Sequence, residues 1–246
     1  MGIAVQKMFD GIAVRYDFLN HFLSAGRDRV WRRKAAACLH GDGNQKVLDL
    51  CGGTGDFWKT WIEIQSNPRN GAVISVNRPL GIIADFSLPM LQEARRKFAP
   101  RNGSGGKRAA SPYLVRMDAL KPCFKAGGFD AVICAYGMRN LDSIPTGIEE
   151  MRRVLRPGGI FITLEFFRPT TWFTRFFYHG LAPLCIPFLG GALSARREAY
   201  SYLVDSIRKF RSVEEYGEQF RQRGFREIAV IPCDFGISHI VTAVKG

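Results

Sequence analysis

The sequence has few of the residue patterns that identify metal sites. Its six cysteines are scattered, none forms a C-x-x-C pair, and the four histidines do not cluster. Because zinc sites use cysteines and histidines at short, regular spacings, we expect no bound metal. Dispersed thiols of this kind are typical of a reducing compartment.

The chain also has little that resembles a leader peptide or an uninterrupted membrane span. The opening residues, MGIAVQKMFDGIAVRYD, contain acids and lack the apolar core of a signal peptide, so we expect a cytoplasmic protein. Residues 172–193 are long enough to cross a bilayer, but Arg175, His179, Pro183 and Pro187 interrupt them. We interpret this segment as a buried or membrane-touching cap.

Acidic residues are in the minority. The 246 residues include 35 Lys and Arg against 22 Asp and Glu, which gives a net charge of +13. This excess allows nucleic acid, an anionic membrane surface or an acidic ligand as a partner. The length and the 46% hydrophobic content fit a single α/β domain over residues 1–246.

Short apolar segments alternate with helical ones along the chain. Strands are expected at 46–50, 81–85, 113–118, 129–136, 160–166, 228–233 and 239–245. Helices are expected within 1–40, after Ser87, over 148–159, and from Ser212 to Gly224. The alternation predicts a Rossmann-like, doubly wound and mostly parallel sheet.

A glycine-rich loop follows the first strand. The strand KVLDL, whose Asp49 is a candidate cofactor contact, runs into CGGTGDF, where Gly52, Gly53 and Gly55 let the backbone approach a ligand closely. A dinucleotide fold requires G-x-G-x-x-G so that a pyrophosphate meets the helix N-terminus. Here Asp56 would repel a phosphate but not a cofactor with a sulfonium and an ammonium group. The loop therefore favours S-adenosylmethionine over a nicotinamide cofactor.

Acidic residues follow the next two strands. Asp85, at the end of the second strand, is placed to accept the ribose hydroxyls of a nucleoside. Its interval from the glycine loop is longer than usual because of the segment 67–79, which leaves Asn77 as the alternative. After the third strand, Asp118 is a candidate for the adenine amino group and Ala119 for a backbone contact. The alternative is that Asp118 is an ordinary aspartate of a turn and binds no ligand.

The fourth strand ends in AYGMRN, at the sheet edge where ligands bind in open α/β folds. Arg139 and Asn140 bring polar groups to that edge. Arg139 is suited to stabilise a phenolate-like oxygen, and a surface salt bridge is the other interpretation.

Together these motifs resemble the ubiquinone/menaquinone biosynthesis C-methyltransferases. The resemblance rests on LDLCGGTGD, ADFSLPML, FDAVICAYGMRN, MRRVLRPGGIFITLEFFRP and REAYSYLVDSIRKF, and it covers roughly residues 7–246. It implies a class I methyltransferase sheet of seven strands with an antiparallel last strand. It also implies methyl transfer from S-adenosylmethionine to a ring carbon of a polyprenylated quinol.

The resemblance further assigns cofactor contacts to Thr54, Asp85, Asp118, Ala119 and Tyr136. Tyr136 stands where relatives often have serine or another small residue. Cys51 replaces the usual alanine, and the segment before Asp85 is the largest departure from the family pattern.

A ring carbon becomes nucleophilic when its neighbouring hydroxyl loses a proton, so the site needs a base or a stabilising cation. Arg139 is our candidate for the phenolate, and Tyr16 and Asp17 are candidates to complete its network. His179 is a candidate base, with core packing as the alternative. Aromatic residues follow Thr171 in sequence and are expected either to shelter the isoprenoid or to pack in the core.

The expected organisation is a helical lid at 1–40 and a substrate cap at 168–210 within the single domain. The polyprenyl tail implies peripheral contact with the inner face of the membrane, which the positive charge would support. A homodimer remains open, as does the choice between a menaquinone and a ubiquinone precursor.

Other functions find less support. Amino-methylating enzymes of nucleic acid carry N/D-P-P-Y/F where this chain has AYGMRN, so no nucleic-acid partner is expected. A nicotinamide-dependent reductase lacks its G-x-G-x-x-G. A methyltransferase of another small molecule and a non-catalytic lipid-binding protein are the remaining alternatives, and binding of S-adenosylmethionine separates the second from an enzyme.

Overall fold

The computed structural model describes residues 3–39, 45–65, 80–99, 111–176, 178 and 194–246. The segment 67–79 and the candidate base His179 lie outside the described residues. So does most of the apolar stretch 172–193. Among the described helices, none combines the length and apolar character needed to cross a membrane.

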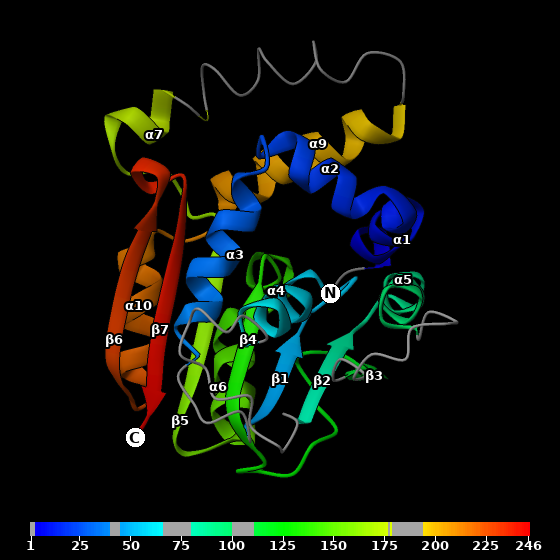
Figure 1. Cartoon of the computed structure of the whole chain (residues 1–246). Coiled ribbons are helices and arrows are strands. Elements are labelled where there is room, and N and C mark those ends of the chain that lie inside the picture. The colour runs from blue at the N-terminus through cyan, green and yellow to red at the C-terminus, as the bar shows by residue number, and fades with distance from the viewer. Residues whose placement is uncertain (1–2, 40–44, 66–79, 100–110, 177, 179–193) are drawn as a thin grey trace.

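A seven-stranded sheet forms the centre of the molecule, with the order β3-β2-β1-β4-β5-β7-β6 (Figure 1). Its strands are β1 (Lys46–Leu50), β2 (Leu80–Asp85), β3 (Tyr113–Arg116), β4 (Phe129–Ala135), β5 (Leu155–Glu165), β6 (Phe225–Cys233) and β7 (Ser238–Lys245). The first five strands pair in parallel, and β7 is antiparallel to β5 and β6. The predicted doubly wound sheet with an antiparallel last strand is confirmed. Because β2 and β4 flank β1, the chain reverses its direction of winding beside β1.

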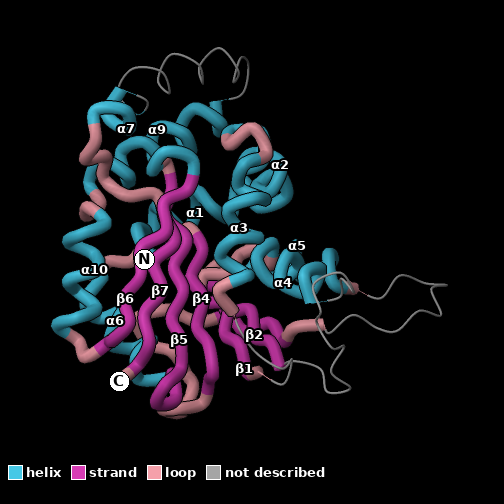
Figure 2. Tube along the Cα trace, turned by 60° about the vertical axis from the view of Figure 1, so that its left-hand side comes forward, coloured by secondary structure: helices cyan, strands magenta, loops and turns pink. Residues whose placement is uncertain are grey.

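Helices cover both faces of the sheet and its upper edge. They are α1 (Ile3–Ile12), α2 (Tyr16–Leu23), α3 (Arg27–Ala37), α4 (Asp56–Gln65), α5 (Leu88–Phe98), α6 (Ile144–Val154), α7 (Trp172–Phe176), α9 (Ser194–Lys209) and α10 (Val213–Gln222), with short 3-10 turns η1 (Ala13–Arg15), η3 (Met138–Asn140) and η5 (Asp234–Gly236). Helices α3 and α4 lie on one face, and α6 and α10 lie on the other (Figures 1 and 2).

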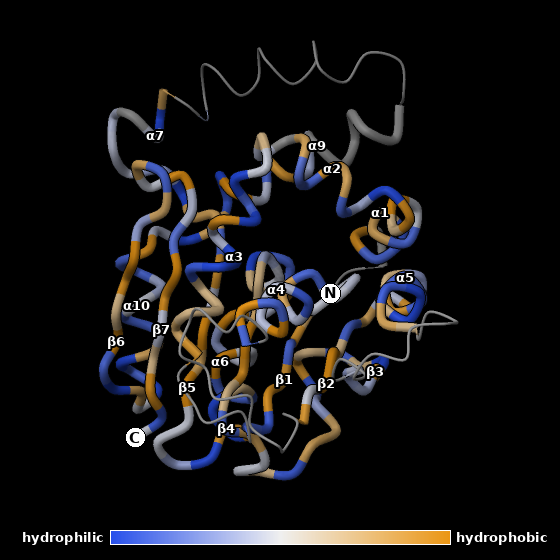
Figure 3. Tube along the Cα trace, in the orientation of Figure 1, coloured by the Kyte–Doolittle hydropathy of each residue, from blue (hydrophilic) through white to orange (hydrophobic). Residues whose placement is uncertain are grey.

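The core has two parts because side chains of a strand alternate between its faces. On β1, Val47 packs with the tryptophans of α3 and α4, whereas Leu48 packs toward α6 and α10. On β4, Ile133 and Val132 divide in the same way. Both strands are apolar along much of their length, as a sheet buried on both faces requires (Figure 3).

Two helix starts agree with their sequence signals. Ser87 accepts the N–H of Met90, and Ser212 and Glu215 form a reciprocal capping box. The helix expected over 148–159 is wrong at both ends, since α6 begins at Ile144 and stops at Val154. Ser143 caps its start, a signal that the periodicity did not reveal. Pro157 explains the early end, because a proline disfavours helical backbone at the residue before it.

The N-terminal helices form a layer over the carboxyl ends of the strands (Figure 1). Their expected role as a lid, and the expected cap at 168–210, remain predictions. Helix α1 contacts α5 and α9, and α3 packs on α4, β5 and β7. These helices therefore cover the space above the carboxyl ends of β1, β2 and β4.

Candidate functional site

A pocket lies where β1, β2 and β4 end, beneath the N-terminal helices. Its lining consists of Phe9, Tyr16, Cys51, Gly53, Asp85, Phe86, Met90, Tyr136, Gly137 and Asn140. Ligands bind at this position in open α/β sheets, beside the strand where the winding reverses. The structure therefore brings four predicted residues, Tyr16, Gly53, Asp85 and Tyr136, into one pocket.

The glycine loop forms the floor of the pocket through backbone that only glycine adopts easily. Gly53 has φ +55° and Gly55 has φ +78°, both in the left-handed region. The N–H of Gly53 donates to Asp85 Oδ2 at 2.9 Å. A β-carbon at Gly53 would have no closer neighbour than Asp85 Oδ2 at 4.0 Å, so this part of the loop faces open space.

Asp85 is held at the end of β2 by backbone donors. In addition to Gly53, the N–H of Ser87 donates to Asp85 Oδ1 at 2.8 Å. Burial raises the pKa of Asp85 to about 6, and these N–H groups limit the rise. A carboxylate that is fixed in this way, with lone pairs remaining, can accept hydroxyl groups of a bound nucleoside.

Asp49 lies beneath the loop and does not line the pocket. It is fully buried, and a β-carbon at Gly52 would stand 2.8 Å from its Cγ. Burial raises the pKa of Asp49 to about 7, while Arg32 opposes the rise and Asp85 adds to it. The lack of a side chain at Gly52 is what allows the loop to close over this carboxyl group.

A chain of charged groups joins the N-terminal lid to the glycine loop. The hydroxyl of Thr54 donates to Asp17, and Lys97 on α5 binds Asp17 at 2.7 Å and also pairs with Asp56. Asp17 of the lid and Thr54 of the glycine loop thus contact each other, and neither residue lines the pocket. Their expected roles in cofactor contact and catalysis remain predictions.

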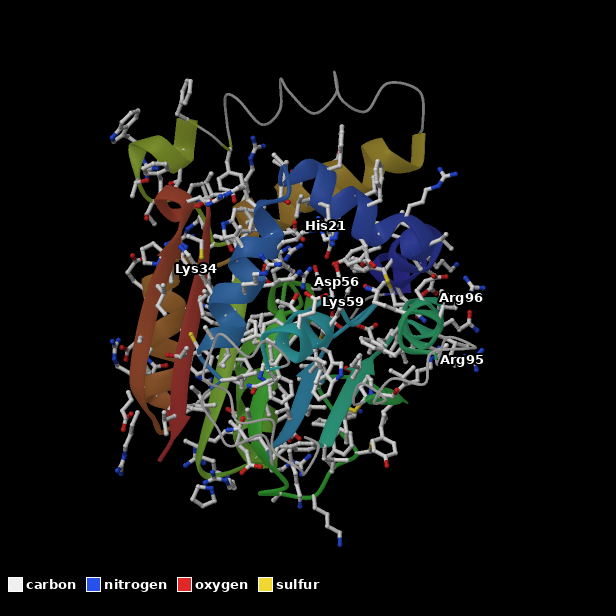
Figure 4. All side chains as sticks on the ribbon, in the orientation of Figure 1. His21, Lys34, Asp56, Lys59, Arg95 and Arg96 are labelled. Atoms are coloured by element: carbon white, nitrogen blue, oxygen red, sulfur yellow. The ribbon has the colours of Figure 1, made fainter. Side chains whose placement is uncertain are left out.

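His21 lies next to these charged groups (Figure 4). His21 Nδ1 lies 2.7 Å from Asp28 Oδ2, and His21 Nε2 lies 3.7 Å from Asp56 Oδ2. These three residues could together offer ligand atoms to a metal ion. However, Arg32 and Lys97 already bring positive charge to the same carboxylates. These contacts connect α2, α3 and the start of α4.

Arg139 forms a buried ion pair with Glu165 at the end of β5. Its guanidinium also donates to the carbonyl of Tyr136 at 3.0 Å and to the hydroxyl of Ser206 at 3.3 Å. Arg139 does form a salt bridge, as the other interpretation holds, but the pair is buried and does not lie on the surface. Burial raises the pKa of Glu165, whereas Arg139 favours its charged form.

Tyr16 faces the pocket from the lid. Its ring lies 6.0 Å from that of Phe9, and Phe9 also contacts the ring of Tyr202 on α9 at 6.4 Å. Burial raises the pKa of Tyr16, although Asn20 and the charges of Arg32 and Arg139 lower it. The phenol is therefore a neutral hydrogen-bonding group at neutral pH.

Tyr136 closes the β4 side of the pocket in a left-handed backbone conformation with φ 62°. Its ring stacks on Phe166 at 4.8 Å between centroids, and the Arg32 guanidinium lies 5.3 Å from the ring centre. The aromatic side chain is buried rather than displayed to solvent. A tyrosine is accommodated here because Phe166 and Arg32 form a slot for its ring.

Two predicted adenine contacts lie outside the pocket lining. Asp118 accepts the N–H of Leu120 at 2.9 Å, which is the turn geometry of the alternative interpretation, and Ala119 is buried in the core. Sequence reasoning did not identify Phe9, Phe86 and Met90 as lining residues. The latter two follow Asp85 in the motif ADFSLPML, so their positions gave a usable signal.

The expected aromatic cap is only partly described. Trp172 and Phe176 are exposed on α7, and Tyr178 is buried with its hydroxyl donating to the carbonyl of Ile237 at 2.7 Å. None of these three lines the pocket. Helix α9 does cover it, because the hydroxyl of Tyr202 donates to Asn140 at 2.8 Å.

Comparisons with known proteins agree with this geometry. The model of the ubiE/COQ5 methyltransferase family matches residues 2–245. The chain is 37% identical over its whole length to the ubiquinone/menaquinone biosynthesis C-methyltransferase UbiE of Geobacter sulfurreducens, of which it covers 90%. It is also 37% identical to the demethylmenaquinone methyltransferase of Deinococcus radiodurans, over 92% of this chain and 86% of that protein.

Solved structures show the same fold at low sequence identity. A methyltransferase of Thermotoga maritima, described as S-adenosylmethionine-dependent and a possible histamine N-methyltransferase, has a TM-score of 0.64 at 17% identity, over 98% of this chain and 99% of its own. An S-adenosylmethionine-dependent methyltransferase of Aquifex aeolicus has a TM-score of 0.60 at 13% identity, over 94% and 98%.

Proposed function

The chain belongs to the ubiE/COQ5 methyltransferase family, and from this premise we propose that it methylates a ring carbon of a polyprenylated quinol. It is an S-adenosylmethionine-dependent C-methyltransferase with a class I fold. Two of its relatives are named for ubiquinone/menaquinone biosynthesis and for demethylmenaquinone, which supports a menaquinone or ubiquinone precursor as the substrate class.

The single observation that carries the proposal is the contact between Gly53 and Asp85 in the pocket above β1. The residues fit the cofactor because the loop has no side chain at Gly53 and the acid stands beside it. In the proposal Asp85 accepts the ribose hydroxyls, and the glycine loop receives the amino-acid end. The cofactor supplies the methyl group, and the positive charge on its sulfur is compatible with Asp49 and Asp56 nearby.

The quinol hydroxyl next to the reacting carbon must lose its proton, which in this proposal passes to water. The chain offers two groups that stabilise the phenolate left behind. Tyr16 lines the pocket and can donate a hydrogen bond to a phenolate oxygen. Arg139 does not line the pocket, but its guanidinium donates to the carbonyl of Tyr136, which does, and it also pairs with Glu165. In the proposal this guanidinium stabilises the negative oxygen. Both roles, and that of Asp17 in holding the lid through Lys97, are parts of the proposal.

Titration of the protein with S-adenosylmethionine tests the cofactor site. Asp85→Ala removes the acceptor, and we expect affinity to fall by about tenfold to a hundredfold, as for the loss of one to two hydrogen bonds to a charged group. Asp130→Ala is the matched control, because Asp130 lies at the opposite end of the sheet, where it binds the N–H of Lys46 and Arg156. Equal affinities for wild type and Asp85→Ala would refute the assignment of Asp85.

The proposed substrate is embedded in a membrane, and we propose that α2 and α7 touch the bilayer surface. Phe18 and Phe22 stack on α2 with centroids 5.9 Å apart, and Phe18 is 58% exposed. Trp172 on α7 is 79% exposed at the same end of the molecule (Figure 1). Exposed aromatic side chains on a protein with a net charge of +13 favour contact with an anionic interface.

Sedimentation with vesicles tests this contact. We expect binding to vesicles that contain phosphatidylglycerol and weak binding to pure phosphatidylcholine. The double substitution Phe18→Ser and Phe22→Ser should weaken it by about tenfold or more, since it removes the two aromatic side chains that would contact the lipid. Tyr113→Ser is the control, since Tyr113 is 64% exposed at the start of β3, away from the lid. Equal loss in both variants would contradict the assigned surface.

A further inference from the structure

Two cysteine sulfur atoms meet under the floor of the pocket. Cys51 follows β1 and Cys134 lies near the end of β4, in the neighbouring parallel strand. A β-carbon at Gly137 would stand 2.8 Å from Cys134 Sγ and 3.1 Å from Cys51 Sγ, so both sulfurs converge on the same place. Both cysteines are free thiols.

The two thiols differ in access. Cys51 lines the pocket and is partly exposed, whereas Cys134 is fully buried in the core. The hydrogen bond with Cys51 is the largest cause that raises the pKa of Cys134, and burial adds to it. Cys134 therefore remains an S–H group next to the sulfur of Cys51. The pair has one sulfur that a pocket ligand can reach and a second sulfur directly behind it.

We propose that Cys51 and Cys134 form an oxidisable dithiol in the cofactor pocket, and that its disulfide blocks the binding of S-adenosylmethionine. The oxidant that we name is a quinone, the two-electron oxidised form of the proposed substrate, so this part rests on the proposed function. Both S–H bonds break and one S–S bond forms. The quinone takes up the two electrons and two protons at its oxygens and leaves as a hydroquinone.

The effect on the cofactor follows from the position of Cys51. An S–S bond is about 2.05 Å long, much shorter than any non-bonded contact between two sulfurs, so the Cys51 side chain must move toward β4. Cys51 has φ 55° and precedes Gly52, whose N–H donates to the carbonyl of Ala84 at 3.1 Å. Moving it displaces the start of the glycine loop. We expect affinity for S-adenosylmethionine to fall by about tenfold or more.

The test uses the full chain with two oxidants. Tetramethyl-1,4-benzoquinone is a quinone without a free ring position, and diamide forms disulfides without any quinone. After treatment, free thiols are blocked, the protein is digested without reduction, and the linked peptides are identified by mass spectrometry. The affinity for S-adenosylmethionine is measured before oxidation, after oxidation, and after dithiothreitol.

We expect a Cys51–Cys134 linked peptide, a loss of affinity that dithiothreitol reverses, and slower oxidation when S-adenosylmethionine is already bound. Cys134→Ala should bind the cofactor as wild type does and keep that affinity after oxidation. Cys123→Ala, which removes an exposed thiol elsewhere, should lose affinity on oxidation as wild type does. The protection by cofactor needs no variant, so it tests the site even where Cys134→Ala folds poorly.

Three results would overturn the proposal: absence of the linked peptide with both oxidants, a linked peptide with unchanged affinity, or equal loss of affinity in Cys134→Ala. Linkage by diamide but not by the quinone would remove the quinone as oxidant. A linked peptide in a protein that methylates no quinol would contradict the proposed substrate and leave the dithiol standing.

Discussion

Replacing the buried acid beneath the glycine loop should stabilise the protein, and more so as the pH rises. Burial raises the pKa of Asp49 from 3.8 to about 7, so its ionised form is unfavourable in the folded state. One pKa unit corresponds to about 1.4 kcal/mol. This raised pKa therefore lowers the free energy of unfolding by on the order of 4 kcal/mol at pH 8 and about 1.5 kcal/mol at pH 5.

The sign follows from proton binding. Between the unfolded and folded pKa values the folded protein holds the extra proton, so its stability falls as pH rises through this window. In Asp49→Asn the side chain does not ionise, so it contributes no pH dependence to stability. Its free energy of unfolding, relative to wild type, should grow by about 2–3 kcal/mol between pH 5 and pH 8. Any fixed cost of the new amide cancels in this comparison between two pH values.

Urea unfolding of the protein without added cofactor, at pH 5, 6, 7 and 8, measures this difference. Asp130→Asn is the control. Burial opposes the charge of Asp130, but the N–H of Lys46 and the Arg156 guanidinium outweigh it and hold its pKa below the usual value. Asp130 is thus ionised across the whole range, and its substitution should have a constant effect. A constant or shrinking difference for Asp49→Asn would contradict a raised pKa of Asp49 in the folded protein.

Other substitutions test the packing and the ion pair by the same urea unfolding. Gly81→Ala should destabilise by about 2–3 kcal/mol, because its β-carbon would lie 1.8 Å from the buried Trp58 ring, and an unchanged midpoint would contradict this packing. Gly11→Ala, with no atom within 4 Å, should instead stabilise α1 by about 0.5–1 kcal/mol, and a loss of stability there would be against expectation. Arg139→Met should cost about 3–5 kcal/mol because Glu165 is left buried and unpaired. Adding Glu165→Gln should restore much of that loss, and a double variant as unstable as the single one would mean that the charge is not the cause.

The sheet and the pocket floor could be predicted because their signals are local. Apolar runs of four to eight residues gave the strands, and the turn CGGTGDF after KVLDL gave the loop. Asp85 was placed correctly at the end of β2 despite the unusual interval before it. The prediction of a helix at 148–159 differs from α6 at both ends, because the first turn of α6 carries no apolar periodicity and Pro157 disfavours helical backbone at Arg156.

The remaining features depend on contacts between distant residues. Arg139 meets Glu165 only because β4 and β5 pair in parallel and end together. Asp17 reaches Thr54 and Lys97 only when α2 lies over the ends of the strands. Cys51 and Cys134 also converge through strand pairing. No periodicity or spacing in one sequence specifies such pairs, so the partners of these side chains are known only from the structure.

The most direct test of the proposed function is methyl transfer itself. The protein is incubated with S-adenosylmethionine labelled in its methyl group and a demethylated polyprenyl naphthoquinol in anionic vesicles. We predict label on a ring carbon of the quinol, and a large loss of that label in Asp85→Ala. A protein that binds the cofactor but leaves the quinol unlabelled, or labels it on oxygen, would contradict C-methylation of a quinol.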